Sequence, residues 1–174
     1  MDLKIISGGQ TGVDQGGLDA AIALGIPHGG TCPKGRKSES GRIPDRFQLT
    51  EGWSDKYPPR TRMNIQDADG TLILVHGTNG LARSRGTTLT LELCRSMRKP
   101  VHAANPRRPE HVDQVVSWVL ELERKSEGVP GWLPELSQGD RPLVINVAGP
   151  RESMAPGIHD ETVKFLSMVI SQLS

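Results

Sequence analysis

Two stretches of the chain combine glycines and hydroxyl residues with a predicted helix start, a combination that binds anions in α/β proteins. The first, residues 7–14 (SGGQTGVD), follows an apolar run, and the second, residues 84–88 (SRGTT), leads from a polar loop into a helix. Backbone N–H groups made accessible by glycine, together with hydroxyls at the helix start, would face a phosphate or another oxyanion. We therefore predict ligand-binding roles for Gly8, Gly9, Gln10, Thr11, Gly12, Asp14, Ser84, Arg85, Gly86, Thr87 and Thr88.

Each stretch also has a purely structural interpretation. Glycines also occur in tight strand-to-helix turns that bind no ligand, and a threonine such as Thr87 is a common helix N-cap residue. The distribution of charge favours a ligand, because the loops that carry glycine turns are rich in cations and hold fewer acids, such as Glu39 and Glu152. The cations of these loops are Lys34, Arg36, Lys37, Arg42, Arg83, Arg85 and Arg151.

Alternating strands and helices must position these loops. Short apolar runs predict strands at residues 3–7, 26–29, 71–75, 101–103 and 143–147. Helical patterns lie between and after them, at residues 13–24, 60–67, 86–97, 110–123 and 157–173. This alternation predicts one three-layer α/β domain over residues 1–174, with a mostly parallel sheet and helices on both faces.

Ligands of such sheets bind beyond the carboxyl ends of the strands, where the loops 8–12, 29–44, 76–86 and 148–156 are expected. The two anion-binding turns would follow neighbouring strands and hold one ligand from both sides. The pair Gly16–Gly17 weakens the first helix, so either a neighbour packs very close there or the helix begins later.

Composition and motif spacing exclude several classes of protein. The formal net charge is +1, which gives no case for nucleic acid or a membrane surface, and no apolar run approaches the ~20 residues of a membrane span. Two cysteines and the lack of a signal-peptide pattern favour the cytoplasm. The first turn lacks the G-x-G-x-x-G spacing and no acid follows the second strand, which argues against an NAD dehydrogenase. The five histidines show no metal-ligand spacing, and no nucleophile–base pair stands out.

Five motifs together resemble the putative molybdenum carrier family, a branch of the SLOG Rossmann-like superfamily. They are residues 7–14, residues 30–35 (GTCPKG), Arg60-Thr61-x-x-Asn64, residues 84–87 and residues 146–152 (NVAGPRE). The resemblance implies a Rossmann-like carrier, without catalysis, that binds molybdenum cofactor, a pterin phosphate carrying molybdenum. It also implies homo-oligomers, molybdoenzymes as recipients, and site roles for Thr31, Lys34, Gly35, Arg60, Asn64, Gly149, Arg151 and Glu152.

Other ligands and activities stay open at this point. Relatives of the family use the same crevice for nucleotides and ADP-ribose-like ligands, and Trp53 or Tyr57 would either stack on a flat ring or pack in the core. Enzymatic relatives similar to phosphoribohydrolases carry P-G-G-x-G-T-x-x-E, where this chain has Ser84-Arg85 for the glycine pair and Thr90 for the acid. Glu92 lies two positions later, so hydrolysis of a nucleoside monophosphate is the alternative function. An interaction module without a small ligand is a third hypothesis.

Overall fold

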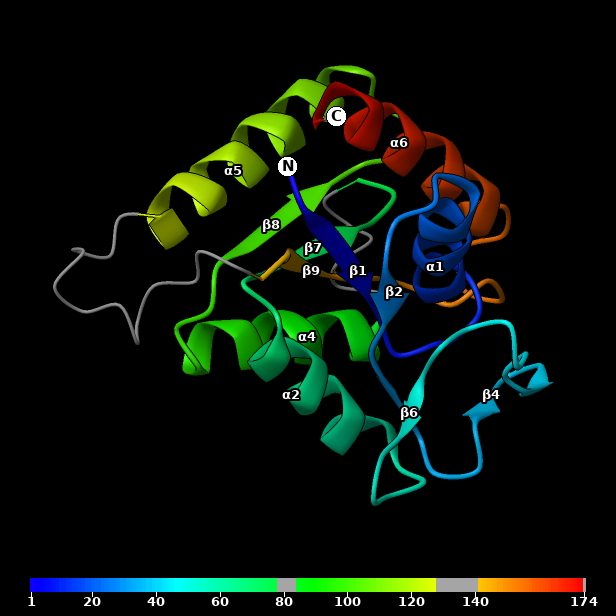
Figure 1. The fold of residues 1–174 in the computed structure, drawn as a ribbon. Helices are drawn as coiled ribbons and strands as arrows, with labels where there is room; N and C mark the ends of the chain where they lie inside the picture. Colours follow the sequence, from blue (N-terminus) through cyan, green and yellow to red (C-terminus); the bar gives the residue numbers. More distant parts are fainter. Residues whose placement is uncertain (78–83, 128–140, 174) are drawn as a thin grey trace, which may run out of the picture.

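A five-stranded parallel sheet forms the middle layer of the protein (Figure 1). The structure is a computed structural model that describes residues 1–77, 84–127 and 141–173. Arg83 and most of the predicted connector at residues 126–141 lie outside this part. The strands are β1 (Leu3–Ile6), β2 (His28–Gly29), β7 (Gly70–Leu74), β8 (Val101–Ala104) and β9 (Leu143–Ala148), and their order is β2-β1-β9-β7-β8.

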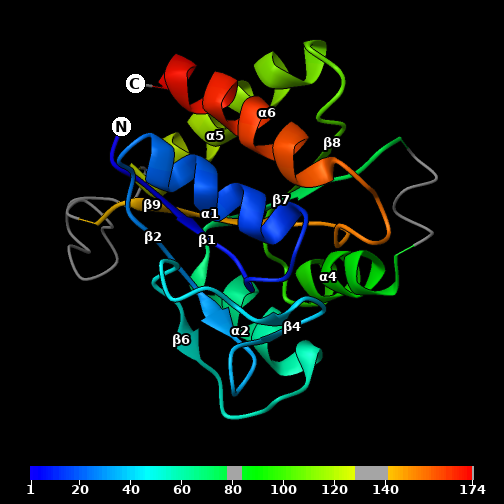
Figure 2. The ribbon, with the colours of Figure 1, turned by 90° about the vertical axis from the view of Figure 1, so that its right-hand side faces the viewer.

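Helices cover both faces of this sheet. Figures 1 and 2 show α1 (Val13–Ala23), α5 (Glu110–Glu127) and α6 (Ile158–Leu173) on one face, and α2 (Tyr57–Asp67) and α4 (Arg85–Ser96) on the other. The predicted three-layer α/β architecture is thereby confirmed. None of the described helices is both long and apolar enough to cross a membrane.

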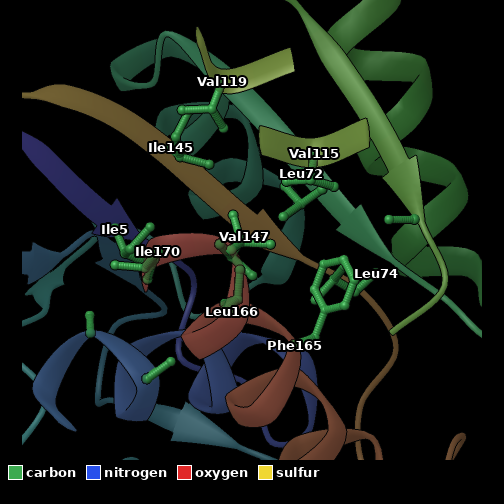
Figure 3. Close-up of a cluster of buried hydrophobic side chains, with 14 of the residues drawn as sticks. Ile5, Leu72, Leu74, Val115, Val119, Ile145, Val147, Phe165, Leu166 and Ile170 are labelled. Atoms are coloured by element: carbon green, nitrogen blue, oxygen red, sulfur yellow. The ribbon is translucent and has the colours of Figure 1, made fainter. Parts of the chain in front are cut away.

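The main hydrophobic core lies between the sheet and the layer of α1, α5 and α6. Figure 3 shows Val147 of β9 close to Leu166 of α6, and Leu72 of β7 beside Val115 of α5. All five residues of β7 are buried, as its continuous apolar sequence predicts for a strand covered on both sides. This core fixes the carboxyl ends of β1, β9 and β7 relative to one another.

The last strand in the chain, β9, occupies the centre of the sheet. It pairs with β1 on one side and with β7 on the other, so β1 and β7 are not neighbours, and that expectation was wrong. If the five strands are numbered by their order in the chain, their order across the sheet is 2-1-5-3-4. If β9 were the first strand of the chain instead of the last, the order would be 3-2-1-4-5, which is that of dinucleotide-binding folds. The start of β1 and the end of α6 lie close together in both views (Figures 1 and 2).

Close packing of α1 explains the glycine pair in that helix. A Cβ on Gly16 would lie 2.7 Å from the carbonyl oxygen of His159, at the start of α6, and one on Gly17 would lie 3.0 Å from Val147 of β9. The helix begins at Val13 as predicted, so the first alternative holds: the glycines let α6 and β9 approach α1.

Residues 30–56 are a long segment with a defined path. It contains β3 (Thr31–Cys32) paired with β6 (Thr50–Glu51), and β4 (Lys37–Ser38) paired with β5 (Gly41–Arg42). Ile43 and Phe47 pack against Leu18 of α1. Arg36 is buried and donates to the carbonyl oxygens of Ile43, Pro44, Phe47 and Leu49. Its guanidinium therefore holds this loop together and is not a cation on the rim of the crevice.

Two helices differ from their predicted bounds by more than one residue. Helix α2 begins at Tyr57 rather than at residue 60, because Pro58 and Pro59 fit the first turn, where a missing N–H costs no hydrogen bond. Helix α5 continues to Glu127, four residues beyond the predicted end.

Candidate functional site

A cavity of about 430 Å³ lies beyond the carboxyl ends of the three central strands. The β1–α1 turn contributes Gln10 and Asp14, the loop after β9 contributes Gly149 and Arg151, and the start of α4 contributes Arg85. The remaining lining residues are Tyr57, Arg60, Thr61, Ser84, Gly86, Leu89, Thr90, Ala148 and Met154. This position is the switch point of the sheet, where ligands of open α/β folds bind.

The structure brings some of the predicted site residues to this cavity and places others behind it. The lining residues among them are Gln10, Asp14, Arg60, Ser84, Arg85, Gly86, Gly149 and Arg151. The ones that do not line it are Gly8, Gly9, Thr11, Gly12, Thr31, Lys34, Gly35, Asn64, Thr87, Thr88 and Glu152. A ligand-binding role for any of these residues is still a prediction.

The glycine-rich turn before α1 is closed by the protein's own side chains. The amide of Gly9 donates to Ser7 Oγ at 3.3 Å, that of Gln10 to Asp14 Oδ2 at 3.2 Å, and that of Thr11 to Gln10 Oε1 at 3.0 Å. The carboxylate of Asp14 thus accepts from an amide at the positively polarised start of α1, where an external anion was expected.

A buried ion pair joins this turn to α2. Arg60 Nη1 lies 3.1 Å from Asp14 Oδ2, and the two side chains are 13% and 4% exposed. Burial raises the pKa of Asp14 above its ordinary value, although Arg60 and the amide of Gln10 oppose the shift. Gly8 makes the pair possible, because a Cβ there would lie 1.6 Å from Arg60 Nη1. Arg60 Nε is buried with no hydrogen-bond partner among the described residues, so this cavity-lining arginine has an unused donor.

The start of α4 is built differently. Ser84 is its N-cap and accepts from the amide of Thr87 at 3.3 Å, so Thr87 is not the cap, and its side chain is buried. The first amides of a helix have no intrahelical partner, and those of Arg85 and Gly86 belong to residues that line the cavity. Within the described part of the chain, Arg85 has no salt bridge. This helix start therefore offers a cation and free N–H groups to an anion.

Arg151, the third arginine of the cavity, is held by a carboxylate. Its Nε lies 3.3 Å from Glu39 Oε2. The same carboxylate accepts from the amide of Ser153 at 3.1 Å and from the hydroxyls of Ser153 and Thr11. Burial alone would raise the pKa of Glu39, but these hydrogen bonds and Arg151 hold it below its ordinary value. Glu39 is therefore ionised at neutral pH and fastens residues 30–56 to the loop after β9.

Several motif residues hold the framework around the cavity. Asn64 accepts from the amide of Thr31 at 2.7 Å and donates to its carbonyl at 2.9 Å, which ties α2 to β3. Glu152 accepts from the amide of His159 at 3.1 Å and from that of Gly157 at the start of α6. Lys34 is exposed in a turn away from the cavity lining. Asn64 and Glu152 therefore have structural roles in this fold that need no ligand.

Three expectations about single side chains need correction. Trp53 is 76% exposed, so it is not a core residue, and Tyr57 lines the cavity rather than the core. Glu92 is exposed on α4 and does not line the cavity, so the acid of the phosphoribohydrolase alternative is not in the site. Leu89 and Thr90 were missed, although they lie three and four positions after Gly86 and so share its helix face.

The cavity brings cationic and apolar side chains together. In the described residues no group of three or more His, Cys, Asp or Glu side chains could hold a metal ion. Leu89 and Met154 offer apolar surface, and Arg60, Arg85 and Arg151 offer cationic donors. Such a mixture suits a phosphorylated ring compound.

The sheet order and its flanking helices define a Rossmann-like α/β protein. The profile of the circularly permutated YpsA SLOG family matches residues 5–170, and the chain belongs to this family. In this sheet the last strand of the chain, β9, takes the central place that the first strand has in dinucleotide-binding folds, as a circular permutation would produce. The crystal structure of a putative molybdenum carrier protein from Syntrophus aciditrophicus SB is similar over 97% of this chain and 96% of that chain, with 34% identity and a TM-score of 0.81. A search of curated proteins gave no match.

Proposed function

We propose that the protein is a carrier that binds molybdenum cofactor, or a closely related phosphorylated heterocycle, in the cavity beyond β9. Family membership and the similarity to a putative molybdenum carrier protein support this proposal. The observation that carries it is the start of α4, where Arg85 and Gly86, whose amides have no intrahelical partner, line the same cavity as Arg60 and Arg151.

The cavity has the size and chemistry that such a ligand needs. Small-molecule sites enclose about 300–1,000 Å³, and this one encloses about 430 Å³. Arg85 and the first amides of α4 would hold the phosphate, and Leu89, Met154 and Tyr57 would surround the ring. A carrier needs only to bind, shield and release its cargo, and the cavity residues named here supply binding groups without a nucleophile–base pair.

Isothermal titration calorimetry with a pterin phosphate and with nucleoside 5′-monophosphates tests the proposal. Arg85→Ala should weaken binding about ten-fold, since it removes a charge-assisted hydrogen bond from the ligand anion. Arg95→Ala is the matched control, because Arg95 lies in the last turn of the same helix and does not line the cavity. Urea unfolding of both variants should match that of the wild type.

Two results would contradict the proposal. The first is the absence of heat with every phosphorylated compound at millimolar concentration. The second is an Arg85→Ala protein that binds as tightly as Arg95→Ala.

Transfer to molybdoenzymes, homo-oligomers and a cytoplasmic location belong to the same proposal. Both cysteines, Cys32 and Cys94, are buried and unpaired, as expected in a reducing compartment. Native mass spectrometry of freshly isolated protein would reveal a retained ligand and the number of subunits in one measurement.

A further inference from the structure

We propose that Glu39 is a specificity-determining residue that restricts the cavity to ligands with a single phosphate. The proposal rests on the proposed function, because it concerns the same cavity and the same anionic ligand. It separates a pterin phosphate or nucleoside monophosphate from compounds with a diphosphate, such as ADP or ADP-ribose.

Glu39 does not itself line the cavity, but its carboxylate occupies the guanidinium of Arg151, a lining residue that a second phosphoryl group would need as a donor. The carboxylate takes a salt bridge from Arg151, an amide N–H and a hydroxyl from Ser153, and a hydroxyl from Thr11. An arginine, a backbone N–H and two hydroxyls are the groups that hold a phosphate in many proteins. Glu39 itself comes from the long 30–56 segment, and its side chain is only 19% exposed.

The charges around the cavity lead to the same conclusion. Arg60 is paired with Asp14 and Arg151 with Glu39, so two of the three arginines are already neutralised. Across residues 1–77, 84–127 and 141–173, Arg85 is the cavity-lining cation with no salt bridge. One phosphate, with a charge of about −1.5 to −2 at pH 7, fits the excess of positive charge at Arg85 and the α4 start. A second phosphate that reached Arg151 would have to displace the Glu39 carboxylate or lie beside this carboxylate. Two negative groups side by side repel each other.

The alternative role for Glu39 is to position Arg151 for the ligand. The two roles predict opposite effects of neutralising the carboxylate. If Glu39 restricts the ligand, Glu39→Gln releases Arg151 and improves the binding of diphosphates. If Glu39 only positions Arg151, Glu39→Gln weakens the binding of every phosphorylated ligand.

Calorimetric titrations of AMP, ADP and ADP-ribose into the wild type and Glu39→Gln decide between these roles. The wild type should bind AMP at least about ten-fold more tightly than ADP or ADP-ribose, and Glu39→Gln should reduce this preference about ten-fold. Glu51→Gln is the matched control, because Glu51 lies in the same 30–56 segment and also accepts a backbone N–H, from Gly35, but among the described residues forms no salt bridge with a cavity-lining arginine. A thermal melt of each variant shows whether the segment has loosened.

Each remaining result overturns the inference. Equal affinity of the wild type for AMP and ADP, or an AMP preference unchanged in Glu39→Gln, removes Glu39 as the determinant while the proposed function stands. Binding of none of the three ligands to either protein, together with no binding of a pterin phosphate, overturns the inference and the proposed function together.

Discussion

The starts of α1 and α4 both face the cavity, but only one of them is free to accept an external anion. Before α1, the amides of Gly9, Gln10 and Thr11 donate to side chains of the same turn, and the Asp14 carboxylate is one of the acceptors. Before α4, Ser84 caps the amide of Thr87, and Arg85 and Gly86 are exposed toward the cavity. Amides with internal partners cannot hold a phosphate, so of the two helix starts we expect that of α4 to bind the anion.

Alanine at one glycine in each start should give opposite changes in stability, and this is the largest effect that we expect. Gly8→Ala places a methyl group on the Arg60 guanidinium, breaks its pair with the buried Asp14, and should lower the free energy of unfolding by about 3–5 kcal/mol. Gly86→Ala meets no atom within 4 Å and should raise it by about 0.5–1 kcal/mol, as alanine favours a helix.

Urea unfolding of both variants measures this difference. The contrast between the two starts would be wrong if Gly8→Ala unfolded at the wild-type midpoint. It would also be wrong if Gly86→Ala were the less stable of the two.

Removing the cap of α4 should have a smaller effect. Ser84→Ala leaves the amide of Thr87 without its acceptor and should cost about 1 kcal/mol of unfolding free energy. Ser96→Ala at the other end of the helix is the control, since that exposed hydroxyl only bonds the carbonyl of Leu93, and its change should stay within about 0.5 kcal/mol. Equal midpoints for the two variants would show that Ser84 does not stabilise this start.

The smallest expected effect is a pH-dependent change in stability at the contact between α1 and α6. His159 of α6 contacts Asp19 of α1 at 3.0 Å and Asp160 at 2.9 Å. Burial lowers the pKa of His159, but these two carboxylates outweigh it and raise the pKa above its ordinary value. A raised pKa in the folded state stabilises the protein below the unfolded value of about 6.5, and this contribution is lost as pH rises through the folded value.

The variant His159→Gln should therefore be less stable than the wild type at pH 5.5 and closer to it at pH 9. Urea midpoints of both proteins at the two pH values provide the measurement. A difference that stays constant with pH would mean that the imidazole does not titrate through this contact.

The layers and helix starts could be predicted from the sequence because they depend on local patterns. Apolar runs such as residues 71–75 and the glycine turn before residue 13 indicate a buried strand and a helix start by themselves. The central place of β9 could not be predicted, because the order of parallel strands depends on pairings such as Leu3 with Leu143 that leave no local signal.

The contacts within the site could not be predicted either, because they join residues whose proximity depends on the folded chain. Asp14 was expected at the start of α1, but its bond to the amide of Gln10 depends on how the turn folds back. Glu39 could not be recognised as a partner of Ser153, which lies 114 residues away. Leu89 and Thr90 were accessible to prediction, since helical spacing alone places them beside Gly86.

Under the proposed function, the central position of β9 also determines when a nascent chain can first bind a ligand. Every other strand of the sheet leaves the ribosome before β9, and until it arrives β1 and β7 have no strand between them. Their facing edges then expose unpaired N–H and C=O groups, which favour aggregation. Because Gly149 and Arg151 follow β9, the last pairing that completes the sheet also completes the cavity. We therefore expect a nascent chain that lacks β9 to bind no ligand.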